Sequence, residues 1–255
     1  MKKIGLALSG GGARGVAHIG VLQALEELGI KFCEIAGTSA GSIVGALYAH
    51  GYSPKEIFEI VQQVSLYKSV RPAWGAGGWL RMDGMRDLLH KYLPENDFKK
   101  LKLPFTAAAT EIKKGEIHYL NEGELIPAIL ASCSIPGIFY PLQLKDGLYV
   151  DGGILDNLPS MPLTRTCDFV VGSHCNLVTP TFDAHSTRAV VERSLLMAIG
   201  AITWSSKQLC DVVIEPPGLD KYTVFDIGRA KEIFEVGYKF TKENFEGKHF
   251  EEMLS

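Results

Sequence analysis

The segment Phe32-Cys33-Glu34-Ile35-Ala36-Gly37-Thr38-Ser39-Ala40-Gly41 joins an apolar run to a helical pattern that continues to about His50. Its last five residues fit the pattern G-x-S-x-G, in which a strand turns sharply into a helix and leaves the serine hydroxyl exposed. A serine that only caps the helix is the plain alternative. The strand-like run before the motif and the helical pattern after it favour a nucleophile, and we predict that Ser39 is the nucleophile of an acyl hydrolase.

Strand-like and helix-like patterns alternate on both sides of this turn. Ile4–Leu8 is a short apolar run, and residues 16–28 carry apolar side chains at helical spacing before Gly29. Ser53-Pro54-Lys55-Glu56 predicts another helix start, with an N-cap, a first-turn proline and a capping-box glutamate. Two βα units so close together predict an α/β fold with three layers, α/β/α, around a mainly parallel central sheet.

The rest of the chain continues the alternation after a break. Residues 65–82 are rich in glycine around Trp74 and Trp79, and we expect a mobile loop there. Beyond it we expect a hairpin, several helices and several short strands. The hairpin is predicted from Phe105–Ile112 and Glu116–Leu120, the helices at 84–92, 124–132, 188–204 and 227–245, and the strands at 142–144, 148–150, 169–173 and 212–215.

Composition narrows the class of protein. The chain has 255 residues, 46% of them hydrophobic and 22% charged, and we expect residues 1–255 to form a single domain with its core at about 4–240. The net charge of −3 carries no basic run, so nucleic acid is not an expected partner. The apolar stretches are too short for a signal peptide or a membrane span. Five scattered cysteines indicate reduced thiols and a cytoplasmic location.

A glycine-rich loop, Ser9-Gly10-Gly11-Gly12-Ala13-Arg14-Gly15, follows the first apolar run. Its backbone N–H groups at the start of a helix suit an anion, which in an acyl hydrolase is the oxyanion of the tetrahedral intermediate. The spacing Gly10-x-Gly12-x-x-Gly15 also fits a dinucleotide-binding loop, so an oxidoreductase is the alternative. That motif needs an acidic residue at the end of the second strand, whereas Glu34 begins the strand.

A serine nucleophile needs a base, and two candidates follow predicted strands. Asp151-Gly152-Gly153 follows Leu148–Val150, although Asp-Gly is also an ordinary turn signal. His174 follows the run that begins at Phe169, and the order Ser39, Asp151, His174 matches that of an α/β-hydrolase triad. The residues alone leave both bases open.

Gly-Gly-Gly-Ala-Arg-Gly, Gly-Thr-Ser-Ala-Gly and Asp-Gly-Gly, in this order, resemble the motifs of the patatin-like phospholipases, and the segment Ser132–Pro141 is similar to the one before the family's aspartate. The resemblance covers about residues 4–240. It implies a patatin-like fold, a Ser39–Asp151 dyad, an oxyanion hole at Gly10, Gly11 and Gly12, lipid acyl esters as substrates and no metal or other cofactor. Arg14 would support the loop or lie near a phosphate headgroup.

The expected function is therefore hydrolysis of fatty acyl esters of a phospholipid or lysophospholipid. A non-catalytic lipid-binding protein is disfavoured because Ser39 and Asp151 are both intact. Trp74 and Trp79, with Lys68, Arg71 and Arg81 nearby, suggest that residues 65–82 bind substrate or contact a membrane surface, since aromatic rings prefer the lipid–water interface. Packing of both tryptophans in the core is the alternative. The oligomeric state is left open.

Overall fold

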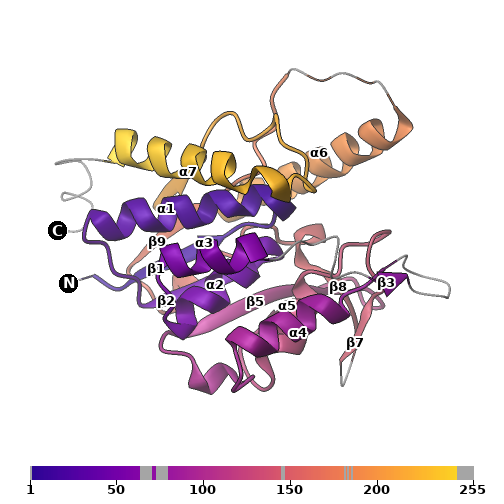
Figure 1. Ribbon diagram of the computed structural model, residues 1–255, viewed down its shortest axis with the longest axis horizontal. Helices are drawn as coiled ribbons and strands as arrows, with labels where there is room; N and C mark the ends of the chain where they lie inside the picture. Colours follow the sequence, from indigo (N-terminus) through magenta and orange to yellow (C-terminus); the bar gives the residue numbers. More distant parts are fainter. Residues whose placement is uncertain are drawn as a thin grey trace.

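The computed structural model describes residues 2–63, 71–72, 80–144, 147–180, 182, 184 and 186–245. Its central sheet has the strand order β10-β9-β1-β2-β5-β8-β7, with β6 paired to β5 (Figure 1). The strands of this sheet are β1 (Ile4–Leu8), β2 (Glu34–Thr38), β5 (Phe105–Glu111), β6 (Glu116–Leu120), β7 (Leu142–Leu144), β8 (Gly147–Asp151), β9 (Phe169–Ser173) and β10 (Val212–Ile214). A separate antiparallel pair is formed by β3 (Arg71–Pro72) and β4 (Leu80–Arg81).

Two kinds of strand pairing divide the sheet. From β10 through β9, β1 and β2 to β5, every neighbouring pair is parallel. Beyond β5 the pairs are antiparallel, as the hairpin prediction requires for β5 and β6. The parallel half brings the carboxyl ends of β1, β2 and β9 to one edge of the sheet, which is where open α/β sheets place their ligands.

Strand β5 brings two distant parts of the chain together. β6 pairs along one of its edges from Ala107 to Glu111. On the other edge β2 pairs as far as Ala108, and β8 takes over from Ala109 in the opposite direction. The end of β2 and the end of β8 therefore meet head to head beside β5.

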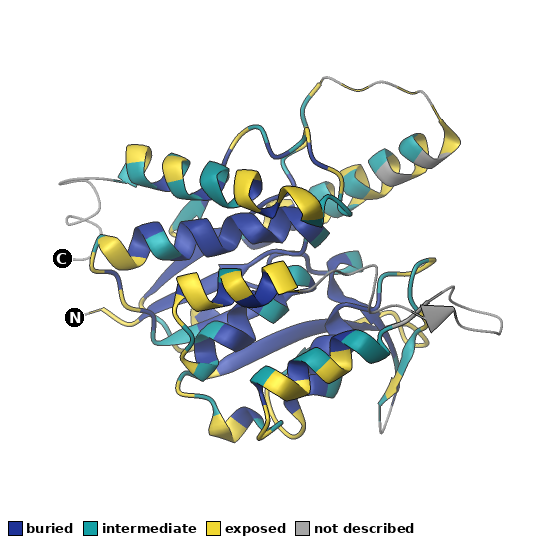
Figure 2. Cartoon of the chain, viewed as in Figure 1, coloured by how far each residue is buried: buried dark blue, intermediate teal, exposed yellow. Residues whose placement is uncertain are grey.

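Seven helices surround the sheet within the described part of the chain. They are α1 (Val16–Glu27), α2 (Ala40–His50), α3 (Pro54–Gln63), α4 (Asp83–Tyr92), α5 (Leu125–Ser132), α6 (Thr187–Lys207) and α7 (Ala230–Phe245). On one face, α2 and α5 lie against the strands, α1 packs beside α2, and α3, α4 and α7 lie outside them (Figure 1). Figure 2 shows α1 almost wholly buried between its neighbours. The α/β fold with a central sheet between helices is confirmed.

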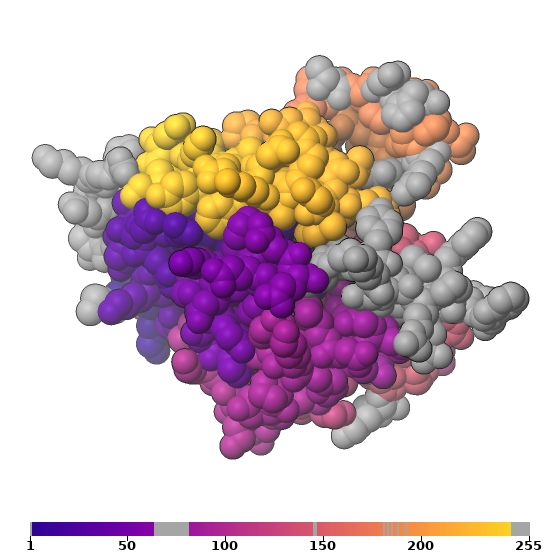
Figure 3. Space-filling model, viewed as in Figure 1, coloured from indigo at the N-terminus to yellow at the C-terminus, as the bar shows by residue number. Residues whose placement is uncertain are grey.

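Helix α6 differs from the others because most of it stands clear of the body of the protein (Figure 3). Its C-terminal end is anchored by Ser206, whose hydroxyl donates to Asp156 Oδ1 at 2.9 Å and whose carbonyl accepts from the Ser160 hydroxyl. The remainder exposes several apolar side chains. These are Val190, Val191, Leu195, Met197, Ile202 and Trp204.

The local signals for helix ends agree with the structure to within a few residues. The capping box before α3 is present, with Glu56 Oε2 accepting from the Ser53 N–H at 2.8 Å and the Ser53 hydroxyl accepting from the Glu56 N–H. The helix predicted at 188–204 runs from Thr187 to Lys207. None of the described helices is long and apolar enough to cross a membrane.

Candidate active site

Ser39 lies at the turn between β2 and α2 in a backbone conformation that side chains rarely adopt, with φ 52° and ψ −122°. The neighbouring glycines explain how the turn fits. A Cβ on Gly37 would collide with the Gly41 carbonyl, and one on Gly41 would collide with the Leu8 carbonyl. Strain of this kind persists only where the surrounding structure holds it in place, and it clusters at functional sites.

Two hydrogen bonds hold the turn. The Ser39 N–H donates to Ser132 Oγ at 2.8 Å, and the Ser42 hydroxyl donates to the Ser39 carbonyl at 2.7 Å. The N–H of the serine is thus already occupied and is not a free donor for a ligand. Ser132 was not predicted as a site residue, although it begins the segment whose resemblance to the family was noted.

Asp151 ends β8, opposite Ala109 of β5, while Thr38 pairs with the adjacent Ala108. This register places the aspartate beside the serine turn. Its Oδ1 accepts from the Gly153 N–H at 2.8 Å, and its carboxyl group has a hydrogen-bonding interaction with the Ser39 side chain. A Cβ on Gly152 would collide with the Ala108 carbonyl, which accounts for the first glycine of Asp-Gly-Gly.

Burial controls the acidity of Asp151. Only 7% of the residue is exposed. Desolvation raises the pKa of its carboxyl group to about 6, because the charged form loses its water, and the hydrogen bonds from Ser39 and Gly153 only partly oppose this effect. A carboxylate with a raised pKa is a better proton acceptor than an ordinary aspartate.

The glycine loop lies next to the serine, but its three N–H groups are not equivalent. The Gly10 N–H donates to the Asn157 carbonyl at 3.0 Å and is therefore not available to an oxyanion. Of the three donors expected from the sequence, the N–H groups of Gly11 and Gly12 remain. Within the described residues, the N–H groups of Gly11 and Gly12 have no hydrogen-bond acceptor. Gly12 has φ 56°, and a Cβ there would collide with the Val224 carbonyl.

Arg14 supports the structure around the loop and does not face the pocket. Its side chain is buried and its Nε donates to the Tyr222 carbonyl at 2.7 Å. Of the two roles expected for Arg14, the geometry therefore matches support of the loop and not contact with a headgroup. Trp74 and Trp79, the other expected substrate-binding residues, lie outside the described residues.

His174 has a partner other than the serine. Its Nδ1 lies 2.8 Å from Glu215 Oε1, which also accepts from Lys207 Nζ at 2.6 Å. Its Nε2 has no partner within the described residues, and burial lowers the pKa of the imidazole. Since Asp151 adjoins Ser39 and His174 is engaged two strands away at the end of β9, the geometry favours the aspartate as base.

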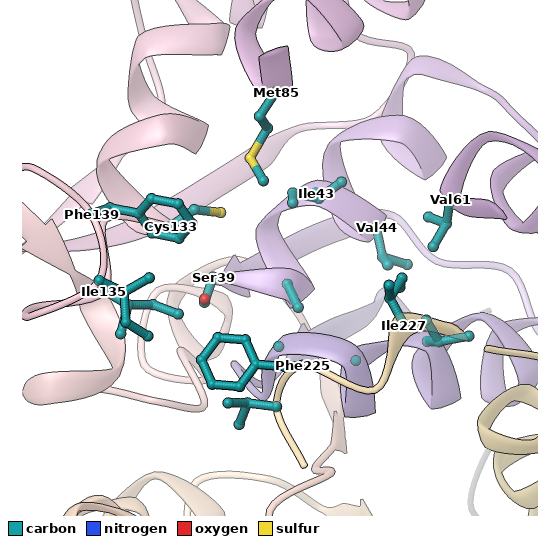
Figure 4. Close-up of a pocket in the computed structure, with 16 residues that line it drawn as sticks. Ser39, Ile43, Val44, Val61, Met85, Cys133, Ile135, Phe139, Phe225 and Ile227 are labelled. Atoms are coloured by element: carbon teal, nitrogen blue, oxygen red, sulfur yellow. The ribbon is translucent and has the colours of Figure 1, made fainter. Parts of the chain in front are cut away.

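An apolar pocket of about 240 Å³ opens beside Ser39. Figure 4 shows the hydroxyl oxygen of Ser39 among side chains from several elements. The described residues that line the pocket are Gly12, Gly15, Val16, Ser39, Ala40, Ile43, Val44, Val61, Met85, Cys133, Ile135, Ile138, Phe139, Val224, Phe225 and Ile227. None of these side chains is charged, so the pocket suits a hydrocarbon chain rather than a headgroup.

Comparison with known proteins shows the family of this chain. The patatin-like phospholipase family matches residues 6–164, a span that includes the glycine loop, Ser39 and Asp151. The chain belongs to this family. Relatives within the family include an uncharacterised NTE family protein of Mycobacterium tuberculosis, which is 37% identical over 63% of this chain and 45% of its own length.

Longer members of the family align with nearly the whole chain. The lysophospholipase NTE1 of Candida glabrata is 28% identical over 94% of this chain, and human patatin-like phospholipase domain-containing protein 6 is 28% identical over 96%. The chain spans only 16% and 20% of these two proteins. The crystal structure of VipD from Legionella pneumophila has a TM-score of 0.52 at 18% identity, covers 95% of this chain and 66% of its own, and shares the fold.

The dinucleotide alternative fails on the geometry that this patatin-like chain adopts. Glu34 lies at the amino end of β2, where its Oε2 accepts from the Thr166 hydroxyl, far from the carboxyl edge where a ribose would bind. The helix start after the glycine loop is also covered, because the Ala13 N–H donates to the Val224 carbonyl at 2.8 Å. A pyrophosphate would need that N–H group.

Proposed function

We propose that this protein hydrolyses carboxylic esters of fatty acids with a dyad of Ser39 and Asp151. The observation that carries the proposal is the pairing of β5, whose one edge holds the ends of β2 and β8 head to head. The strained serine and the buried carboxyl group with its raised pKa lie together at this junction. A nucleophile adjacent to a base with a pKa near the working pH is the arrangement that acyl transfer requires.

The chemistry follows from these two groups. Ser39 Oγ attacks the ester carbonyl carbon while its proton passes to the Asp151 carboxylate. The tetrahedral intermediate then collapses, the bond to the alcohol breaks, and Asp151 returns the proton to the leaving oxygen. In the second half, Asp151 takes a proton from a water molecule, which attacks the acyl-enzyme, and the fatty acid leaves as Ser39 regains its proton.

The oxyanion of each tetrahedral intermediate requires donors beside Ser39. Gly11 and Gly12 are the members of the loop whose N–H groups have no acceptor among the described residues, and Gly12 lines the pocket. We assign the oxyanion hole to these two N–H groups. The loss of one such donor typically costs on the order of 3 kcal/mol in transition-state stabilisation.

The pocket supports a substrate with a single fatty acyl chain. Its lining is apolar and includes Ser39, so an acyl chain in the pocket has its ester group at the serine. Similar fungal proteins such as NTE1 of Candida glabrata are named lysophospholipases, which accords with one chain per substrate molecule. We therefore propose a lysophospholipid or another single-chain ester as substrate.

Such substrates reside in membranes and micelles, and we propose that the protein meets them by peripheral contact. The exposed apolar side chains of α6 support this proposal, since Trp204 and Met197, which lie on the same face of the helix, are 66% and 56% exposed. Large apolar side chains on one face of a surface helix insert into the headgroup region of a bilayer. The five free thiols support a reducing compartment, the cytoplasm.

The dyad is tested with a fluorophosphonate probe and hydrolysis of a short soluble ester. Wild-type protein should be labelled at Ser39, and both Ser39→Ala and Asp151→Asn should lower kcat/KM by about 10²–10⁴-fold, as for general-base loss. The double variant should be little worse than either, because the two residues act as a unit. His174→Ala is the matched control and should keep most activity. A folded His174→Ala protein as inactive as Ser39→Ala would replace the dyad with a histidine triad.

A further inference from the structure

Gly10, the first residue of the glycine loop, is held at both of its peptide groups. Its N–H donates to the Asn157 carbonyl at 3.0 Å. Its carbonyl accepts from Asn176 Nδ2 at 2.7 Å, the shortest of its contacts, from the Ser9 hydroxyl at 3.0 Å and from Cys175 Sγ at 3.2 Å. Asn176 is buried and comes from the loop that follows β9, 166 positions along the chain from Gly10.

The carbonyl of Gly10 and the N–H of Gly11 belong to the same peptide group. In a trans peptide these two groups point in opposite directions across a rigid plane. A side chain that fixes the direction of the carbonyl therefore also fixes the direction of the N–H. Asn176 makes no hydrogen bond to the Gly11 N–H, yet it provides the shortest of the three hydrogen bonds that fix the direction of this donor.

The order of the strands gives the direction. β1 lies between β9 and β2, and Asn176 follows β9. The Gly10 carbonyl thus points toward the β9 side, and the Gly11 N–H points toward the β2 side, where Ser39 begins the turn into α2. A Cβ placed on Gly10 would lie 3.2 Å from Ser39 Cβ, which shows how closely the loop approaches the nucleophile.

The loop needs such a restraint because Gly10 and Gly11 lack side chains. A peptide between two glycines meets little steric resistance to rotation. The amide of Asn176 also bears an unusual cost. Its Oδ1 is buried with no partner within the described residues, and a buried acceptor left unpaired typically costs about 1–3 kcal/mol. The hydrogen bond from Asn176 Nδ2 to the Gly10 carbonyl offsets part of this cost.

We infer that Asn176 is a positioning residue for the oxyanion hole, which holds the Gly10–Gly11 peptide so that the Gly11 N–H faces the substrate carbonyl. The inference rests on the proposed acyl hydrolase function. It adds a residue outside the three sequence motifs and beyond residues 6–164, the span that matches the family.

The test compares Asn176→Leu and Asn176→Ala with wild type and with Ser173→Ala. Ser173 Oγ lies 2.7 Å from His18 Nδ1, so the control removes a hydrogen bond from the same buried region without touching Gly10. The readouts are kcat and KM for a short soluble ester, the melting temperature, and the dissociation constants of two ligands of equal chain length. One ligand is an alkyl trifluoromethyl ketone, whose adduct with a serine carries an oxyanion, and the other is a fatty alcohol.

Both Asn176 variants should lower kcat by about 10–10³-fold with KM changed less than about threefold, the pattern of a damaged oxyanion hole. The dissociation constant of the ketone should increase by a similar factor, and that of the alcohol should not change. Ser173→Ala should lower the melting temperature without these changes. An equal loss of affinity for both ligands, or a normal kcat in a folded Asn176 variant, would overturn the inference.

A crystal structure of wild-type protein labelled by a fluorophosphonate tests the same point without a variant. The phosphonyl oxygen should accept from the Gly11 N–H at about 2.7–3.1 Å while the Gly10 carbonyl stays on Asn176. A rotated Gly10–Gly11 peptide would contradict the inference. If Ser39→Ala were fully active, the proposed function would fail instead, so the two failures are distinguishable.

Discussion

As the base of the proposed dyad, Asp151 combines two properties that are normally opposed: it must be ionised to accept a proton, yet it lies where ionisation is costly. Burial raises the pKa of its carboxyl group to about 6. At neutral pH most of the carboxyl groups remain ionised, with a proton affinity closer to that needed for serine. The burial that the fold imposes on Asp151 thus gives its carboxylate the basicity that the proposed reaction needs.

The first prediction at the residue scale concerns the pH profile. Because the ionised form of Asp151 is the base, kcat/KM for a neutral short-chain ester should fall as the pH decreases through about 6, and it should be level above that value. The measurement is kcat/KM between pH 4.5 and 8.5, with circular dichroism at each pH to confirm folding. An acid limb near pH 4, where an ordinary aspartate titrates, would contradict a buried base.

The second residue-scale prediction concerns stability. The pKa of Asp151 is higher in the folded protein than in the unfolded chain, so the folded state binds more protons between pH 3.8 and about 6. The free energy of unfolding therefore decreases as the pH rises through this window, and the penalty is fully present above pH 6. Asp151→Asn removes the buried charge, and at pH 8 it should be more stable than wild type by about 2–3 kcal/mol.

Denaturant unfolding of both proteins at pH 8 and pH 4 measures this difference. The advantage of Asp151→Asn should shrink to a small fraction at pH 4, where the wild-type carboxyl group is neutral in the folded state and only partly ionised in the unfolded chain. A constant difference at the two pH values would show that the substitution acts through packing and not through the charge.

At the scale of elements, the contact of α1 with α7 depends on two glycines. A Cβ on Gly20 would collide with the Phe234 carbonyl, and one on Gly237 would collide with the Ala17 carbonyl. The helices therefore approach each other backbone to backbone. The segment just before α7 accepts from the Ala13 N–H of the glycine loop through the Val224 carbonyl, and its Val224, Phe225 and Ile227 line the pocket. The packing of α7 on α1 therefore also positions one wall of the site.

Gly237→Val should push α7 away from α1 and destabilise the protein by about 1–3 kcal/mol, the usual cost of overpacking. The matched control is Gly200→Ala in α6, where a Cβ would have no atom within 4 Å. That substitution should stabilise the protein slightly, since alanine favours a helix over glycine by about 0.5–1 kcal/mol. Thermal unfolding measures both, and equal shifts in melting temperature would show that the close helix contact has no energetic importance.

At the scale of the whole molecule, the projecting helix α6 gives the protein an apolar surface away from its core (Figure 3). The double variant Met197→Ser with Trp204→Ser should lower activity on lysophospholipid in vesicles by about tenfold, as the loss of roughly 1.4 kcal/mol of binding predicts. Hydrolysis of a short soluble ester should not change. Ser205→Ala, an exposed polar site on the same helix, is the control.

Co-sedimentation with vesicles and analytical ultracentrifugation accompany this assay. Unchanged vesicle binding by the double variant would exclude α6 as the membrane contact. If the wild type were a dimer and the double variant a monomer, the same surface would be an interface between two copies of the chain.

The sequence by itself determined the features that depend on neighbours along the chain. The strand-turn-helix at Ser39, the capping box at Ser53 and the β5–β6 hairpin are each a matter of local backbone sterics, hydrogen bonding and apolar periodicity, and the structure has them where the pattern predicts. The order of three motifs likewise indicated the family before any geometry was known. What these patterns do not specify is which distant group each polar atom contacts.

The tertiary structure decided those contacts. Only the shared edge of β5 brings Asp151 to the serine turn, and only the chain after β9 brings Asn176 to Gly10. It also placed the Tyr222 carbonyl within hydrogen-bonding distance of Arg14 Nε, and the Asn157 carbonyl within hydrogen-bonding distance of the Gly10 N–H. The physical reason is that a hydrogen bond is satisfied by whichever group folding places within about 3 Å, and partners more than a hundred residues away leave no periodic or local signal in the sequence.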